Sequence, residues 1–299
     1  MDLRTQRIIT ALRAAHSAMS PESMTPEDLE RQRRGQKLLG RLVAPMLGME
    51  WKPFSLAGMP ASWTCPERCY ERRRVVLYCH GGGYTSGNLS YSRILSAKLA
   101  GASGRSVLSF EYRIAPEHPY PAALEDAMKA WDSLMYQGYG ARDIVLAGDS
   151  AGGNLALVLV FKLRQMKRQM PGAIVLFSPW TDMTCCGPTF RSIAPADPIL
   201  TPDYVKAVRN VYAPGADYTS PLLSPLFGDF RDFPPTLIQA GENEILRSDA
   251  ERLRNRMISH GAPCRLEIWS GLWHVFQMFP MKKAGEAMDH VGEFLGSLY

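Results

Sequence analysis

Residues 143–166 constrain the fold of this chain more than any other part of its sequence. An apolar run at residues 143–147 leads into Gly-Asp-Ser-Ala-Gly-Gly at residues 148–153, and an apolar helical pattern extends over residues 151–166. The run contains Ile-Val-Leu, which fits a strand buried on both faces of a sheet. The segment therefore predicts a buried strand, a tight turn that carries Ser150, and a helix that starts at once.

The same alternation of strand and helix extends over most of the 299 residues. A pair of strands within residues 51–70 would open the sheet. Apolar, β-rich runs predict further strands at residues 75–79, 106–112, 143–147, 173–177, 236–240 and 265–269. Helical spacing of apolar residues predicts helices at residues 121–137, 151–166, 250–259 and 281–298. This order predicts an α/β fold, with a mostly parallel, eight-stranded sheet flanked by helices.

Two parts of the chain lie outside this alternation. Residues 3–19 and 26–47 carry apolar residues at helical spacing, and the second helix would begin with Thr25 as N-cap and Pro26 as its first residue. Residues 181–233 are rich in Pro, Asp, Ser and Thr, with one helical segment near residues 202–211. We expect residues 1–48 and 181–215 to form a helical cap, or lid, over the mouth of the sheet. Residues 49–180 and 216–299 would form the α/β domain.

Composition and charge argue against several classes of protein. The net charge is +5, but the basic residues form short scattered clusters without a nucleic-acid-binding motif, so we expect no nucleic-acid partner. Residues 1–20 show no signal peptide, because arginines interrupt their apolar runs. The sequence contains no run of about 18 apolar residues, so it predicts no membrane span. We therefore expect a cytoplasmic protein without stable membrane insertion.

The cysteines give no pattern of metal ligands. Cys65 and Cys69 are spaced like a ligand pair, but no second pair of suitable spacing follows them. We expect all six cysteines to be free thiols in a reducing compartment. They are Cys65, Cys69, Cys79, Cys185, Cys186 and Cys264.

The turn at residues 148–153 matches Gly-x-Ser-x-Gly, the pattern around a nucleophilic serine. A nucleophile on so tight a turn needs small neighbours, which Gly148 and Gly152 supply. The start of the following helix also favours negative charge beside Ser150. The pattern by itself recurs by chance, so an ordinary Gly-Ser loop is the alternative. The strand before the turn and the helix after it favour a nucleophile.

A second motif, His-Gly-Gly-Gly at residues 80–83, follows the predicted strand at residues 75–79. Consecutive glycines let backbone N–H groups turn toward one point and stabilise an oxyanion. The expected donors are Gly81, Gly82 and the N–H of Ala151, which follows the nucleophile. A phosphate-binding loop is the alternative, but Asn88 and Leu89 stand where such a loop needs Lys and Ser or Thr.

A general base for Ser150 must come from one of six histidines. His274 alone lies in a loop after a late strand and before the last helix, where the base belongs in a chain ordered Ser, acid, His. The other five have plainer interpretations. His16 and His290 would lie on helix surfaces, His118 in a Pro-rich turn and His80 in the glycine loop. His260 would lie at a helix end, where a cation suits the dipole.

Three motifs in this order resemble the hormone-sensitive-lipase-like family of esterases. They are residues 80–83, residues 111–122 (Glu-Tyr-Arg-Ile-Ala-Pro-Glu-His-Pro-Tyr-Pro-Ala) and residues 148–153, and the resemblance extends from about residue 74 to the C-terminus. It implies the α/β-hydrolase fold, with the α/β domain as the catalytic domain. It also implies hydrolysis of short- to medium-chain acyl esters without metal or organic cofactor. Ser150 would attack the ester carbonyl and His274 would take its proton.

The acid of the triad is where this sequence departs from the family. The family usually places an Asp in an Asp-Pro-Leu-like turn, whereas residues 241–249 read Gly-Glu-Asn-Glu-Ile-Leu-Arg-Ser-Asp. Aligning Ile-Leu with Pro-Leu puts Glu244 in the place of the acid, and Ser-His-Glu triads occur on this fold. Glu242 and Asp249 are the alternatives. We expect Glu242 to point to the opposite face or into solvent, and Asp249 to stabilise the start of the next helix.

Other functions share this layout. Amide hydrolases similar to arylacetamide deacetylase carry comparable motifs, and the gibberellin receptor resembles the family but lacks the histidine that His274 supplies here. The expected partner is a small ester, and a homodimer through the last strand, residues 265–269, is expected because family members often pair there. Five aromatic residues are candidates to line a pocket near the lid, with core packing as the alternative for each one: Trp51, Trp180, Phe190, Tyr204 and Trp273.

Overall fold

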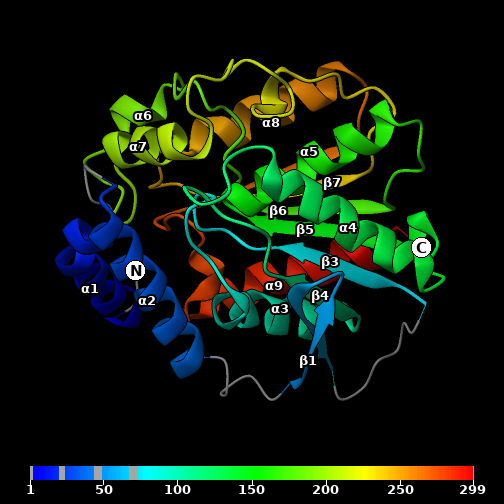
Figure 1. The fold of residues 1–299 in the computed structure, drawn as a ribbon. Helices are drawn as coiled ribbons and strands as arrows, with labels where there is room; N and C mark the ends of the chain where they lie inside the picture. The colour runs from blue at the N-terminus through cyan, green and yellow to red at the C-terminus, as the bar shows by residue number, and fades with distance from the viewer. Residues whose placement is uncertain (1–2, 20–23, 44–48, 67–72, 299) are drawn as a thin grey trace.

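The computed structural model describes residues 3–19, 24–43, 49–66 and 73–298. Its centre is an eight-stranded sheet in the order β1-β2-β4-β3-β5-β6-β7-β8 (Figure 1). β2 pairs antiparallel with β1 and with β4, and the other neighbouring strands are parallel. The mostly parallel sheet of the predicted α/β fold is thereby confirmed. The strands are β1 (Glu50–Leu56), β2 (Met59–Cys65), β3 (Val75–Cys79), β4 (Ser106–Phe110), β5 (Ile144–Asp149), β6 (Ala173–Phe177), β7 (Thr236–Gly241) and β8 (Cys264–Trp269).

Helices cover both faces of this sheet. In Figure 1, α4, α5 and α8 lie on one side of the strands, and α3 and α9 lie on the other. α1, α2, α6 and α7 gather at one end of the molecule, beside the sheet. The helices are α1 (Leu3–Met19), α2 (Pro26–Val43), α3 (Leu89–Ser103), α4 (Ala122–Tyr136), α5 (Ala151–Gln165), α6 (Thr189–Ser192), α7 (Pro202–Tyr212), α8 (Arg247–Ser259) and α9 (Lys282–Gly296).

Alternate side chains of β3 enter two separate apolar cores. Val75 and Leu77 pack in the larger core with α4 and α5, whereas Val76 and Tyr78 pack in a second core with α3 and α9. Every residue of β3 is buried. A strand covered on both faces therefore appears in the sequence as a continuous apolar run without alternation.

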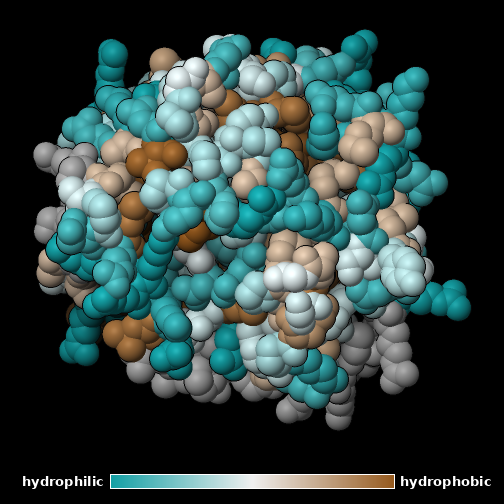
Figure 2. Space-filling view, viewed as in Figure 1, coloured by the Kyte–Doolittle hydropathy of each residue, from teal (hydrophilic) through white to brown (hydrophobic). Residues whose placement is uncertain are grey.

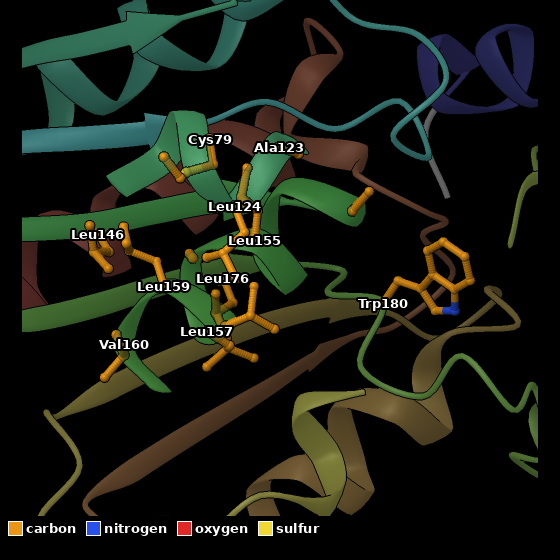
Figure 3. Packing of buried hydrophobic residues seen from close by; sticks show 14 of the residues in the cluster. Cys79, Ala123, Leu124, Leu146, Leu155, Leu157, Leu159, Val160, Leu176 and Trp180 are labelled. Carbon is orange, nitrogen blue, oxygen red and sulfur yellow. The ribbon is translucent and has the colours of Figure 1, made fainter. Parts of the chain in front are cut away.

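The helix that follows the turn at Ser150 is fixed by the larger core. Leu155 and Leu159 of α5 lie beside Leu146 of β5 and Leu176 of β6 (Figure 3), and all four side chains are buried. Each such side chain stabilises the fold by about 1.5–3 kcal/mol relative to exposure. This packing holds the first turn of α5 at the carboxyl end of β5.

The sequence did not predict α3. Its ends carry recognisable signals, since the side chain of Asn88 caps the N–H of Tyr91 and Gly104 ends the helix with a φ of 62°. Most of the helix between these ends, however, is buried between the sheet, α2 and α9. A helix covered on several sides has no single apolar stripe, so helical periodicity is a weak signal there.

The start of α2 follows the prediction. The N–H of Asp28 donates to Oγ1 of Thr25 at 3.2 Å, and the N–H of Thr25 donates back to Oδ2 of Asp28 at 3.3 Å, with Pro26 as first helical residue. This reciprocal pair is a capping box. α2 ends at Val43, so residues 44–47 of the predicted helix lie outside the described residues.

In the described part of the chain, no helix is both long and apolar enough to cross a membrane. Five cysteines there are free thiols: Cys65, Cys79, Cys185, Cys186 and Cys264. Cys69 lies outside the described residues.

Candidate active site

The turn at Ser150 joins the end of β5 to the start of α5. Ser150 has a φ of 54° and a ψ of −119°, a conformation that residues other than glycine seldom adopt. Its N–H donates to the carbonyl oxygen of Phe177 on β6 at 2.9 Å. A Cβ on Gly148 would lie 2.3 Å from the carbonyl oxygen of Gly152, and a Cβ on Gly152 would lie 2.1 Å from that of Cys79. The need for small residues on both sides of the serine is confirmed.

The glycine loop after β3 lies against this turn, but its first glycine is already engaged. The N–H of Gly81 donates to Oδ1 of Asp149 at 2.8 Å, which contradicts the expectation that Gly81 donates to an oxyanion. Gly82 (φ 112°) and Gly83 (φ 64°) have left-handed backbone conformations, and both line the cavity beside the serine. Within the described residues, the N–H groups of Gly82, Gly83 and Ala151 have no hydrogen-bond acceptor. These three groups are the donors open to a bound oxyanion.

His274 and Glu244 face each other at the carboxyl ends of β8 and β7. His274 is 6% exposed and Glu244 is fully buried. Nδ1 of His274 lies 4.0 Å from Oε2 of Glu244, and such contacts are often longer without substrate than during catalysis. The same Oε2 accepts hydrogen bonds from the hydroxyl of Ser178 at 2.8 Å and the N–H of Gly241 at 3.0 Å. Nδ1 and Oε1 have no hydrogen-bond partner among the described residues.

Burial determines the charge preference of this pair. It lowers the pKa of His274 and raises the pKa of Glu244, because both charged forms lose hydration. The hydrogen bonds from Ser178 and Gly241 oppose the rise in the pKa of Glu244, since they favour the carboxylate. A neutral imidazole can accept the proton of a serine hydroxyl, so this environment suits a general base.

The two alternative acids make other contacts. Glu242 is partly exposed, and its Oε2 accepts hydrogen bonds from the loop at residues 270–271, at 2.9 and 2.8 Å. Asp249 is buried, and its Oδ2 accepts from the N–H groups of Thr181 and Asp182 at 2.9 and 3.0 Å. Asp249 also lies in the first turn of α8, where a carboxylate was expected to stabilise the helix start. It holds the chain that follows β6.

Ser150 and His274 line one cavity of about 470 Å³, together with Gly82 and Gly83. These residues follow β5, β8 and β3, so the cavity lies at the carboxyl ends of parallel strands. Ligand sites of open α/β sheets occur at that edge, and the volume is typical of a small-molecule site.

Helices α1, α2 and α7 form much of the cavity wall. Leu12 comes from α1, Gln36 from α2, and Tyr204 and Val208 from α7. Figure 2 shows that hydrophilic residues dominate this face of the molecule and that hydrophobic residues appear in recesses between them. The lining of the cavity itself is largely apolar.

Two of the five aromatic candidates line the cavity, namely Trp180 and Tyr204. The other three do not line it. Trp51 is on the edge strand β1, Phe190 is buried in the larger core, and Trp273 packs in a third core with residues of α9. An aromatic residue close to the expected lid in the sequence can therefore pack in a hydrophobic core and not line the pocket.

Comparisons with known proteins agree with this geometry. A family profile described as alpha/beta hydrolase fold matches residues 76–278. The crystal structure of an esterase from the bacterial hormone-sensitive lipase (HSL) family has a TM-score of 0.89 and 33% identity, and the match covers 100% of this chain and 99% of that one. The chain belongs to the hormone-sensitive-lipase-like family of the α/β-hydrolase fold. The family expected from the three motifs is confirmed.

Other similar proteins match nearly the whole length of this hormone-sensitive-lipase-like chain. An acetyl-hydrolase of Streptomyces hygroscopicus is 37% identical over 264 residues, which covers 88% of this chain and 86% of the relative. The crystal structure of EstE5, soaked by p-nitrophenyl butyrate, has a TM-score of 0.92 and 32% identity, with 100% of this chain and 99% of that chain covered.

Sequence reasoning missed the contacts that hold the glycine loop of this family member. Asp149 is fully buried, and its carboxylate accepts from the hydroxyl of Tyr78 at 2.5 Å, the hydroxyl of Tyr91 at 2.7 Å and the N–H of Gly81 at 2.8 Å. Burial raises the pKa of Asp149, and these three donors oppose the rise. A signal was present, because an Asp at the end of an apolar strand needs donors wherever it is buried.

Among the histidines whose side chains the structure describes, His274 alone lines the cavity. His80 is buried and stacks on a tyrosine ring. His260 lies at the end of α8, and its Nδ1 accepts the N–H of Phe230 at 2.9 Å. The side chain of His16 lies outside the described residues.

Proposed function

We propose that this protein is a serine carboxylesterase that hydrolyses short- to medium-chain acyl esters through an acyl-enzyme intermediate. Ser150 is the nucleophile, His274 the general base and Glu244 the acid. The observation that carries the proposal is that Ser150, His274 and two glycines with unpartnered N–H groups meet in one apolar cavity. The name of the acetyl-hydrolase relative and the butyrate ester soaked into EstE5 support the same class of substrate.

The reaction proceeds in two halves. Oγ of Ser150 attacks the carbonyl carbon of the ester while Nε2 of His274 takes the hydroxyl proton. The carbonyl oxygen becomes an oxyanion, which the N–H groups of Gly82, Gly83 and Ala151 stabilise; each such donor contributes about 10²–10³-fold in rate. His274 then protonates the leaving alcohol, and the acyl group stays on Ser150. Water then attacks the acyl carbon while His274 takes its proton, and His274 passes this proton to Oγ of Ser150 as the acyl–serine bond breaks and the carboxylic acid is released.

Glu244 acts on the imidazole and not on the substrate. Its carboxylate accepts the Nδ1–H of His274, which fixes the tautomer and stabilises the imidazolium formed in both half-reactions. The two groups must close from 4.0 Å to about 2.8 Å for this charge-assisted hydrogen bond.

Hydrolysis of p-nitrophenyl butyrate and labelling by a fluorophosphonate probe test the proposal together. The wild-type protein should turn over the ester and be labelled once, at Ser150. Ser150→Ala should lose about 10⁶-fold in kcat and all labelling. Ser109→Ala is the control, because Ser109 is a buried serine on β4 that does not line the cavity. An unlabelled but folded wild-type protein would instead favour a non-catalytic ligand-binding function.

Residues 1–48 and 181–215 are proposed to act as a cap over the cavity. Leu12, Gln36 and Val208 from these segments line it. Arg33 on α2 also donates from Nε to the carbonyl oxygen of Thr85, just after the glycine loop, at 2.9 Å. A covalently bound inhibitor should therefore change protease cleavage within these two segments. Identical cleavage with and without inhibitor would argue against a cap.

A homodimer in the cytoplasm is also proposed. β8 is the last strand of the sheet, and Ile268 on it is 38% exposed; an uncovered strand of this kind is a ready site for pairing. Sedimentation should detect a dimer at micromolar concentration, and a monomer alone would exclude it. The free cysteines support a reducing compartment, which cell fractionation tests.

A further inference from the structure

Ser178 occupies a place between the candidate acid and the loop of the candidate base. It directly follows β6, is fully buried, and has a φ of 47°, which serine rarely adopts. Its N–H donates to the carbonyl oxygen of Gln239 on β7 at 2.7 Å. The sheet therefore holds this residue in a strained conformation that places its hydroxyl between two functional segments.

The direction of both hydrogen bonds at that hydroxyl is determined. The N–H of Val275, next to His274 in the chain, can only donate, and it lies 3.0 Å from Oγ of Ser178. The hydroxyl proton is thus free to donate to Oε2 of Glu244, at 2.8 Å. We propose that Ser178 is a positioning residue of the esterase reaction, which holds the Glu244 carboxylate and the His274 loop together through one hydroxyl. This inference rests on the proposed function.

The surroundings of Glu244 make this donor important. Besides His274, the titratable groups that act on it are the carboxyls of Asp197, before α7, and Asp249, on α8, and both raise its pKa. Against them and against burial, the carboxylate of Glu244 receives two hydrogen bonds from the described residues, one from Ser178 and one from the N–H of Gly241. Ser178 is the one of these donors that substitution can remove.

Loss of the hydroxyl should appear in the pH profile. The active form needs an ionised Glu244 and a neutral His274, so kcat/KM falls as pH drops through the pKa of the pair. Without the donor the carboxylate is less favoured, its pKa rises, and the acidic limb moves to higher pH. One charge-assisted hydrogen bond corresponds to a shift of about one to two pH units. KM should change little, because Ser178 does not line the cavity.

Two variants and a matched control test this inference. Ser178→Ala removes the hydroxyl, and Ser178→Gly removes it while relieving the backbone at a positive φ, so folding is protected in at least one of them. Ser224→Ala is the control, because the hydroxyl of Ser224 also bridges two segments in a buried site. It accepts from the N–H of Met183 at 2.7 Å and donates to the carbonyl oxygen of Tyr218 at 2.6 Å. Each protein is assayed with p-nitrophenyl butyrate from pH 5 to 9, with a melting curve at pH 7.

We expect both Ser178 variants to lose about 10- to 100-fold in kcat at pH 7 and to recover most of it at pH 9. Ser224→Ala should lose thermal stability without any shift of the limb. An unshifted limb in the Ser178 variants, or the same shift in Ser224→Ala, would overturn the positioning role. An inactive and unlabelled wild-type protein would refute the proposed function itself and this inference with it.

Discussion

Replacing Gly152 by alanine would test how closely the nucleophile turn must approach the glycine loop. A Cβ at this position would lie 2.1 Å from the carbonyl oxygen of Cys79 and 2.4 Å from that of His80. Heavy atoms in contact need about 3.5 Å, so one backbone must move by about 1.4 Å from the other. Gly152 lies in the first turn of α5 and the two carbonyls lead into the glycine loop. The movement therefore separates Ser150 from its proposed oxyanion donors.

The size of the effect follows from this displacement. A misplacement of about 1 Å can cost about 10²-fold in rate, so kcat/KM should fall by at least that factor. Overpacking of a rigid site costs about 1–3 kcal/mol, which corresponds to a decrease in Tm of roughly 2–12 °C for a chain of this size. The loss of activity should therefore be much larger than the loss of stability implies.

The assay compares Gly152→Ala with Gly285→Ala, a glycine in α9 whose added Cβ would meet no atom within 4 Å. Alanine is favoured over glycine within a helix by about 0.5–1 kcal/mol, so the control should keep full activity and melt slightly higher. Both are measured with p-nitrophenyl butyrate and by calorimetry. The reasoning is refuted if Gly152→Ala keeps kcat/KM within about threefold of wild type, since no 1 Å displacement would then exist.

Four other predictions concern the acid, the pH dependence of stability, the cavity and the cap. Glu244→Gln should lower kcat/KM by about 10⁴-fold and Asp249→Asn by little; the reverse ranking would make Asp249 the acid. Burial raises the pKa of Asp249 to about 7, above its unfolded value, so wild type should lose stability as pH rises toward 7; the gain in Tm of Asp249→Asn should therefore be larger at pH 8 than at pH 5. The 470 Å³ cavity should favour four-carbon over sixteen-carbon p-nitrophenyl esters, and faster cleavage of the long ester would contradict this. Arg33→Met breaks the ion pair with Glu117 (2.8 Å) and should raise proteolysis of residues 1–48 at unchanged Tm of the α/β domain, measured by digestion and calorimetry.

The fold was predictable from the sequence wherever one local pattern described one element. The strands at the centre of the sheet are continuous apolar runs because both of their faces are covered, and β3 is the clearest case. α2 was predicted to its first residue because its capping box lies within four consecutive residues. α3 escaped prediction because contacts on several sides remove the apolar stripe on which periodicity depends.

The candidate site divides in the same way. The turn at Ser150 was predictable since Gly148 and Gly152 sit within two residues of it, and the space that they provide is local. Glu244 was placed by alignment with a family pattern. Which glycine N–H groups are open to an oxyanion was not predictable, and the choice of Gly81 was wrong because its N–H is taken by Asp149.

The sequence by itself determined the order of strands and helices, the nucleophile turn and the family, because these depend on residues close together in the chain. The tertiary structure decided which polar groups meet. Gly81 and Asp149 are 68 positions apart, Ser178 and Glu244 are 66 apart, and Ser178 and Val275 are 97 apart. Parallel strands bring these residues to one edge of the sheet. A hydrogen bond forms or fails within a few tenths of an ångström, and only the packed sheet and its helices fix positions to that precision.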